Sequence, residues 1–201
     1  GGKQFFPDLW RDATTAVADA EAKFVAIDLA LDLVGRFGGE MPTGFPDDWL
    51  PIASEEAMHF ALVRRRLRSL GADYGDLPAH DGLWEAASDT RHDISARLAV
   101  VPMVLEARGL DVTPAIRKKL VSIGDMAGAK HLDIILRDEI GHVATGNRWY
   151  RHLCMRDGLD PLRTYAELAQ RYGAPVLKGP FNLTTRRAAG FDEAELLALG
   201  G

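Results

Sequence analysis

The chain has 201 residues, of which 47% are hydrophobic and 26% are charged, a balance typical of one folded domain with a substantial core. Its formal net charge of −5 argues against a general attraction to nucleic acid or to anionic membranes. The single cysteine, Cys154, excludes an intrachain disulfide, and no apolar run is long enough to span a membrane, so we expect a cytoplasmic protein. Because the chain begins with Gly1 rather than Met, we expect it to be trimmed, with further residues upstream.

Hydrophobic residues recur at helical spacing over four long segments. The first segment runs from about Pro7 to Phe37 and ends at Gly38 and Gly39, and the second runs from about Asp48, its expected N-cap, to Leu70. The short link between them predicts an antiparallel pair of helices. Residues 71–82 lack a helical period and are long enough to cross the length of a helical bundle.

The third helix is expected from about Leu83 to Arg108, with a kink at Pro102 and an end at Gly109. Thr113 and Pro114 then have the order of an N-cap and a first helical residue, which predicts a short helix to about Ile123.

The fourth long helix is expected from about Asp125 to Asp157. A short helix should follow from Asp160 to Tyr172, then an irregular segment over residues 173–190 and a last turn capped by Asp192. No useful β-alternation occurs, so the predicted class is all-α. We expect one domain over residues 1–201, with a four-helix bundle over about 7–157, additional short helices, and a C-terminal helical extension over 158–201.

Two copies of the motif Glu-x-x-His fall in the second and fourth long helices. Glu56 and His59 form one copy, and Glu139 and His142 form the other, 83 residues later. Residues i and i+3 share a helix face, so each copy can present a carboxylate and an imidazole to one point. Two such motifs on facing helices supply four of the six ligands of a di-metal carboxylate site, which takes one further Glu from each of the other two helices.

The motif spacing also selects positions on the first and third helices. Glu106 lies 33 residues before Glu139, and the same offset before Glu56 leads to Lys23. A cation therefore stands where a sixth ligand is expected. The five predicted ligands are Glu56, His59, Glu106, Glu139 and His142.

Three further acidic residues are candidates for supporting roles. Asp19 lies one turn before Lys23 on the same face and is able either to pair with its ammonium or to reach a metal. Glu55 and Asp138 each precede a predicted ligand glutamate. They are candidates to orient a ligand histidine on a neighbouring helix, and the alternative is that they are ordinary surface carboxylates.

Six stretches together resemble one known family, the uncharacterised ferritin-like proteins related in fold to the di-iron tRNA hydroxylases. The resemblance covers most of the chain and is carried by residues 26–33 (AIDLALDL), 55–60 (EEAMHF), 74–84 (YGDLPAHDGLW), 105–111 (LEARGLD), 137–143 (RDEIGHV) and 178–182 (KGPFN). It implies a ferritin-like bundle with a di-metal centre, and it implies no particular reaction. Members of that family carry Glu at the position of Lys23 and often Arg at the position of Met58, so this chain departs at both.

The first departure changes the charge of the predicted site. Two divalent ions bring four positive charges, which four carboxylates neutralise, whereas three carboxylates and an ammonium leave a positive excess. In one hypothesis Lys23 has displaced a metal, leaving one ion or none, with its ammonium paired to Glu56, Glu106 or Glu139. In a second, both metals bind and Lys23 is neutral, carbamylated or turned away. In a third, a helix shift brings Glu21 inward.

The leading functional prediction is an iron- or manganese-dependent oxidoreductase that uses dioxygen and a small-molecule substrate, although the mixed oxygen and nitrogen ligands would also suit zinc. One alternative is a metal-poor or metal-free bundle with a structural or partner-binding role. Another is an RNA-modifying hydroxylase, suggested by the arginines between residues 64 and 68. For that arginine run, a solvated face with intramolecular ion pairs is the simpler interpretation.

Overall fold

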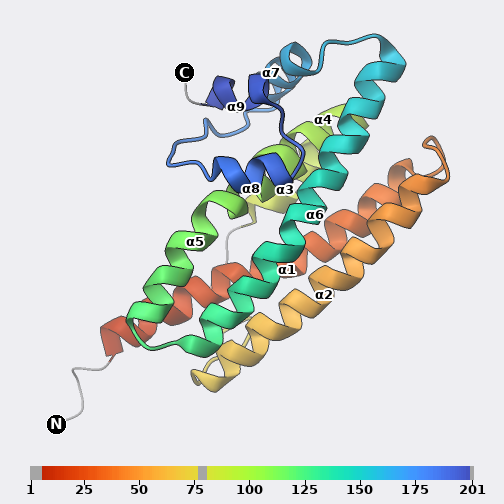
Figure 1. Ribbon diagram of the computed structural model, residues 1–201. Coiled ribbons are helices and arrows are strands. Elements are labelled where there is room, and N and C mark those ends of the chain that lie inside the picture. Colours follow the sequence, from red (N-terminus) through yellow and green to blue (C-terminus); the bar gives the residue numbers. More distant parts are fainter. Residues whose placement is uncertain (1–5, 77–80, 200–201) are drawn as a thin grey trace.

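The computed structural model describes residues 6–76 and 81–199, with the backbone alone over residues 6–19, and these residues form helices and connections without any strand (Figure 1). The all-α prediction is thus confirmed. The helices are α1 (Phe6–Phe37), α2 (Gly44–Ser69), α3 (Gly82–Asp89), α4 (Ile94–Val100), the π-helix η1 (Val101–Glu106), α5 (Ala107–Ser122), α6 (Met126–Asp157), α7 (Pro161–Arg171), α8 (Leu183–Ala188) and α9 (Glu193–Leu199). Within the described part of the chain, no helix is both long enough and apolar enough to cross a membrane.

Helices α1 and α2 form the expected antiparallel pair, joined by a short link at one end of the molecule (Figure 1). Helix α2 begins at Gly44, so the prediction that Asp48 is its N-cap was wrong. Pro46 lies in the first turn of α2, where a backbone N–H would have no acceptor within the helix, so its absence in proline costs no hydrogen bond. The Asp48 carboxylate instead accepts a hydrogen bond from Trp149 Nε1 of α6 at 2.9 Å, which ties the start of α2 to α6.

The predicted third helix is interrupted near its start. Helix α3 ends at Asp89, and the chain restarts at Asp93, whose carboxylate accepts a hydrogen bond from Ala96 N at 3.0 Å. The fully buried side chain of Arg97 in α4 reaches back across the break and donates to Thr90 Oγ1 at 3.0 Å and to Ala87 O at 2.5 Å. These bonds satisfy the polar groups that the break leaves inside the protein.

Past this break, helix continues without a gap from α4 through η1 to the end of α5. The predicted end at Gly109 and the predicted N-cap at Thr113 were therefore wrong, and Pro114 lies inside α5. Proline has no N–H, so the Leu110 carbonyl loses its helical donor. The Asn182 side-chain amide donates to that carbonyl at 3.4 Å, which compensates for the proline.

The kink expected at Pro102 takes the form of the π-helix η1, which ends at Glu106. Pro102 packs closely against Gly146 of α6, where an added Cβ would lie 2.5 Å from the Cβ of Pro102. Only glycine permits this approach. The contact brings the end of η1 close to α6, and π-turns of this kind are frequent at functional sites.

The C-terminal residues form more helix than the sequence predicted. Helix α7 is capped by Asp160 and α9 by Asp192, as expected. The segment predicted to be irregular contains α8, capped by Asn182, whose side chain accepts a hydrogen bond from Thr185 N at 3.2 Å. The fully buried Arg186 of α8 pairs with Asp111 of α5 at 2.7 Å. This pair anchors the C-terminal segment to the long helices.

Candidate metal centre

Helices α1, α2 and α6 and the junction of η1 with α5 bring the six positions selected by the motif spacing into one place. The two motif pairs are buried, with relative exposures of 2% for Glu56, 0% for His59, 6% for Glu139 and 2% for His142. The buried side of α2 faces the buried side of α6, as the i, i+3 spacing requires.

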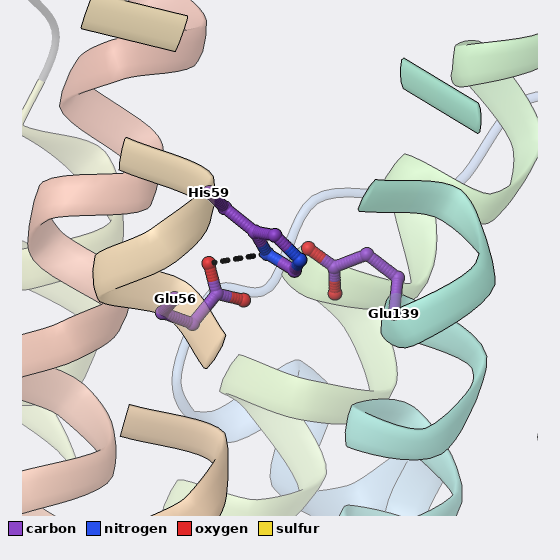
Figure 2. A group of neighbouring side chains, drawn as sticks. All are labelled: Glu56, His59 and Glu139. Atoms are coloured by element: carbon purple, nitrogen blue, oxygen red, sulfur yellow. Dashed lines mark hydrogen bonds and ion pairs between the residues drawn. The ribbon is translucent and has the colours of Figure 1, made fainter. Parts of the chain in front are cut away.

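Three of these side chains lie within reach of a single ion. One ligand atom from each of Glu56, His59 and Glu139 falls within 4.8 Å of the other two, and the side chains converge from α2 and α6 (Figure 2). His142 Nδ1 lies 3.0 Å from Glu56 Oε1 and 3.6 Å from Glu139 Oε2. Glu139 Oε2 is buried without a hydrogen-bond partner among the described residues. Such an orphaned carboxylate oxygen suits a cation, so the donor set fits a divalent metal.

The two motifs hold each other's histidine through crossed contacts. His59 Nε2 lies 3.0 Å from Asp138 Oδ2 of α6, and His142 Nε2 lies 2.7 Å from Glu55 Oε2 of α2. Each carboxylate directly precedes the glutamate of the opposite motif. A carboxylate at Nε2 fixes the proton on that nitrogen, which directs Nδ1 of each ring toward the centre.

Lys23 contacts both central glutamates. Its Nζ lies 3.2 Å from Glu56 Oε2 and also pairs with Glu139 Oε1. Nζ also lies 3.3 Å from Glu56 Oε1, so the ammonium contacts both oxygens of Glu56. Of these oxygens, Oε2 lies 3.3 Å from His59 Nδ1 and Oε1 lies 3.0 Å from His142 Nδ1. Glu139 thus offers one oxygen to Lys23 and the other toward His142.

The alternative in which Glu21 replaces Lys23 is not seen. Glu21 accepts a hydrogen bond from the Tyr74 hydroxyl at 2.5 Å, and α1 is unbroken through this region. The side chain of Asp19 lies outside the part of the chain whose side chains are described, so its predicted role stays a prediction.

The charges of the site act strongly on one another. Burial by itself would raise the pKa of Glu56, but the Lys23 ammonium and the contacts with His142 and His59 hold that pKa well below its usual range. Burial would lower the pKa of His142, yet its contacts with Glu56 and Glu55 raise it above the usual value. The site therefore favours an ionised Glu56 even though it is buried.

Glu106 has a different environment from the other two glutamates. Burial, followed by the negative charge of Glu56, raises the pKa of Glu106 to about 7. Its side chain lies in the wall of a cavity of about 140 Å³, which also touches Lys23, Glu56 and Glu139. The sequence predicted Glu106 as a ligand but gave no sign of this cavity, because its apolar walls come from helices far apart in the chain.

Three of the four arginines in the run on α2 are paired within the molecule. Arg64 and Arg68 contact Asp73 at 2.7 and 2.8 Å, and Arg66 contacts Asp125 at 2.9 Å. Ion pairs of this kind are what a solvated helix face is expected to show.

Comparison with known proteins places the chain in a family. Residues 11–197 match the sequence profile of the family described as Protein of unknown function (DUF455), and the chain belongs to that family. It is similar to an uncharacterised protein of Haemophilus influenzae, with 48% identity over 190 residues. That match covers 92% of this chain and 66% of the relative, so the chain spans just under two thirds of the relative's length. No solved structure matches the chain.

Proposed function

We propose that this protein is a ferritin-like four-helix bundle that binds one iron or manganese ion and acts as an oxygen-dependent oxidoreductase. The four helices are α1, α2, the continuous α4–η1–α5 segment, and α6. The crossed histidine–carboxylate contacts carry the proposal, because they direct two imidazoles at a buried pair of glutamates. Iron or manganese in such a site supplies redox chemistry with dioxygen, and the chain's residues hold the ion and exclude water.

The charge of the site favours one ion over two. Glu56, Glu106 and Glu139 together with Lys23 carry two net negative charges when all four are ionised. One divalent ion neutralises this charge, and a second would leave two uncompensated positive charges in a poorly solvated place. The Lys23 ammonium thus takes the electrostatic role of a second ion.

The contacts of Lys23 also favour one side of the centre for the ion. Lys23 contacts both oxygens of Glu56 but only Oε1 of Glu139. The orphaned Glu139 Oε2 lies 3.6 Å from His142 Nδ1, which favours an ion on the His142 side. Glu106 lies in the wall of the same cavity as Glu56 and Glu139 and is the third carboxyl group available to the ion. The trio of Glu56, His59 and Glu139 is the alternative position for the ion.

Metal analysis tests the proposal directly. After anaerobic loading with Fe²⁺ or Mn²⁺ and desalting, the protein should retain about one equivalent per chain. Lys23→Glu restores a fourth carboxylate and should raise the content to about two equivalents, while the exposed control Lys130→Glu should leave it at one. A chain that retains no metal would support the metal-free bundle instead.

Two histidine variants distinguish the sides of the centre. His142→Ala should weaken Mn²⁺ binding by more than about 100-fold, because loss of a ligand exceeds the 10–100-fold effect of losing its outer partner. His59→Ala should weaken binding much less. The reverse order in a Mn²⁺ titration would place the ion beside His59.

Exposure of the iron-loaded protein to dioxygen should change its optical spectrum, and an unchanged spectrum would argue against oxygen chemistry.

The RNA-modifying alternative has less support, since three of the four arginines that suggested it have acidic partners within the chain.

A further inference from the structure

The cavity beside the candidate metal centre is polar at one end and apolar elsewhere. Lys23, Glu56, Glu106 and Glu139 line its polar end. Most of the remaining wall is aliphatic and comes from α1, α3, α5 and α6 and the end of η1, with Thr113 as the other polar residue. Ligand pockets commonly combine a mostly apolar wall with a few convergent polar groups.

The cavity is large enough for a small organic molecule. Its volume is about 140 Å³. An apolar cavity of about 150 Å³, engineered into a different protein, stays free of water and binds benzene. The space is partly open to solvent, so a molecule of matching size can enter it and bury apolar surface against the aliphatic wall.

Small residues leave this space open. Ala22 and Ala26 of α1 and Gly109 of α5 all line the cavity. A Cβ added at Gly109 would meet no other atom within 4 Å, so close packing does not require glycine there. Glycine inside a helix is less stable than alanine, and Gly109 has no left-handed backbone conformation to accommodate. What Gly109 provides at this position is space in the cavity wall.

The charge at the polar end limits what enters. Three carboxyl groups face one ammonium, so an anionic group on a ligand would meet net negative charge in the metal-free protein. We propose that this cavity binds a small, neutral, largely apolar organic molecule of about the size of benzene, or the apolar end of a longer molecule. Binding itself does not require the metal, whereas the identification of this molecule as the substrate rests on the proposed function.

Thermal unfolding of the metal-free protein tests binding. With EDTA present, saturating benzene should raise the Tm of the protein, and benzoate at the same concentration should not. Gly109→Leu should fill part of the cavity and abolish the benzene shift. Gly35→Leu is the matched control, because Gly35 is exposed in α1 and a Cβ there also meets nothing within 4 Å. This control should keep the full shift.

A second variant keeps the test informative if Gly109→Leu does not fold. Gly109→Ala should stabilise α5 and reduce the benzene shift without removing it. The absence of a benzene shift in the unmodified protein would overturn the proposal, and so would an equal shift in Gly109→Leu. A benzene shift in a chain that retains no metal would support the cavity while rejecting the metal function, so the two proposals fail independently.

Discussion

Two cations in this molecule, one fully buried and one partly buried, have very different surroundings. Arg186 forms a pair with Asp111 in which both side chains are fully buried, and Asp111 also accepts a hydrogen bond from the backbone of Asn182 at 2.9 Å. The guanidinium of Arg186 also lies 5.0 Å from the ring centroid of Phe191. Lys23 instead contacts two glutamates, with Glu106 in the same cavity wall.

The difference lies in the balance of charge. One carboxylate balances the charge of Arg186, and the pair joins α8 to α5, although Arg186 Nη1 has no hydrogen-bond partner among the described residues. The cluster around Lys23 has a surplus of carboxylates and contains an orphaned oxygen of Glu139. A balanced cluster is expected to stabilise the fold under all conditions, whereas an unbalanced cluster should gain stability from an added cation.

The largest expected effect is on the balanced pair. Asp111→Asn should lower the free energy of unfolding by about 3–5 kcal/mol, because it leaves the Arg186 charge buried without a counter-ion. The loss should be the same in EDTA and in Mn²⁺, as measured by urea denaturation. The exposed pair of Arg117 with Asp133 provides the control, and Asp133→Asn should cost less than about 1 kcal/mol. A loss at Asp111 that Mn²⁺ reverses would contradict the comparison.

Removal of the Lys23 charge should give a smaller loss that depends on metal. Lys23→Met should destabilise the EDTA-treated protein by about 2–3 kcal/mol, since Glu56 and Glu139 then repel each other without a cation between them. Mn²⁺ should recover most of this loss. Lys130→Met on the exposed face of α6 is the control. Equal stability of the Lys23 variant with and without Mn²⁺ would show that the cluster does not respond to metal.

The crossed contacts predict that a change at Glu55 weakens Mn²⁺ binding more than a change at Asp138. Burial alone would predict the reverse, because Asp138 is the more buried of the two. Glu55 is half exposed, at 49% for its side chain, and Asp138 is 13% exposed. Because Glu55 contacts His142, Glu55→Gln should weaken Mn²⁺ binding by about 10-fold. Asp138→Asn acts on His59 and should change binding less, while lowering stability by about 1 kcal/mol. Calorimetric titration of both variants checks the order, and a larger binding defect for Asp138→Asn would place the ion beside His59.

The smallest effect concerns pH at another buried cation, Arg97. Burial acts to raise the pKa of its partner Asp32, but hydrogen bonds from Arg36 and Arg97 outweigh this and lower that pKa below its usual value. A carboxylate with a lowered pKa contributes stability above its unfolded pKa of about 3.9 and loses that contribution as the pH falls further. The free energy of unfolding of the unmodified protein should therefore exceed that of Asp32→Asn by a smaller amount as the pH is lowered from 5 to about 3. Urea denaturation in the presence of EDTA measures this difference. A constant difference would contradict this assignment.

The sequence by itself determined the course of α2 and α6 and the meeting point of the motifs they carry. Helix α6 has the predicted bounds because Asp125 caps its start and Gly158 ends it in the left-handed conformation that glycine favours. The positions of Glu56, His59, Glu139 and His142 followed from helical spacing, which depends only on local backbone geometry. The same offset led to Lys23, and its pairing with Glu56 was among the predicted alternatives.

Tertiary structure decided what local signals could not. The pair Thr113 and Pro114 has the local pattern of a helix start, yet α5 continues through it because Asn182, far along the chain, donates to the Leu110 carbonyl. The π-turn that ends at Glu106 and the cavity beside it depend on Pro102 packing against Gly146. Spacing along one helix specifies which residues share a face. Contacts between distant segments decide which carboxylates pair with Lys23 and how large the cavity beside the cluster is.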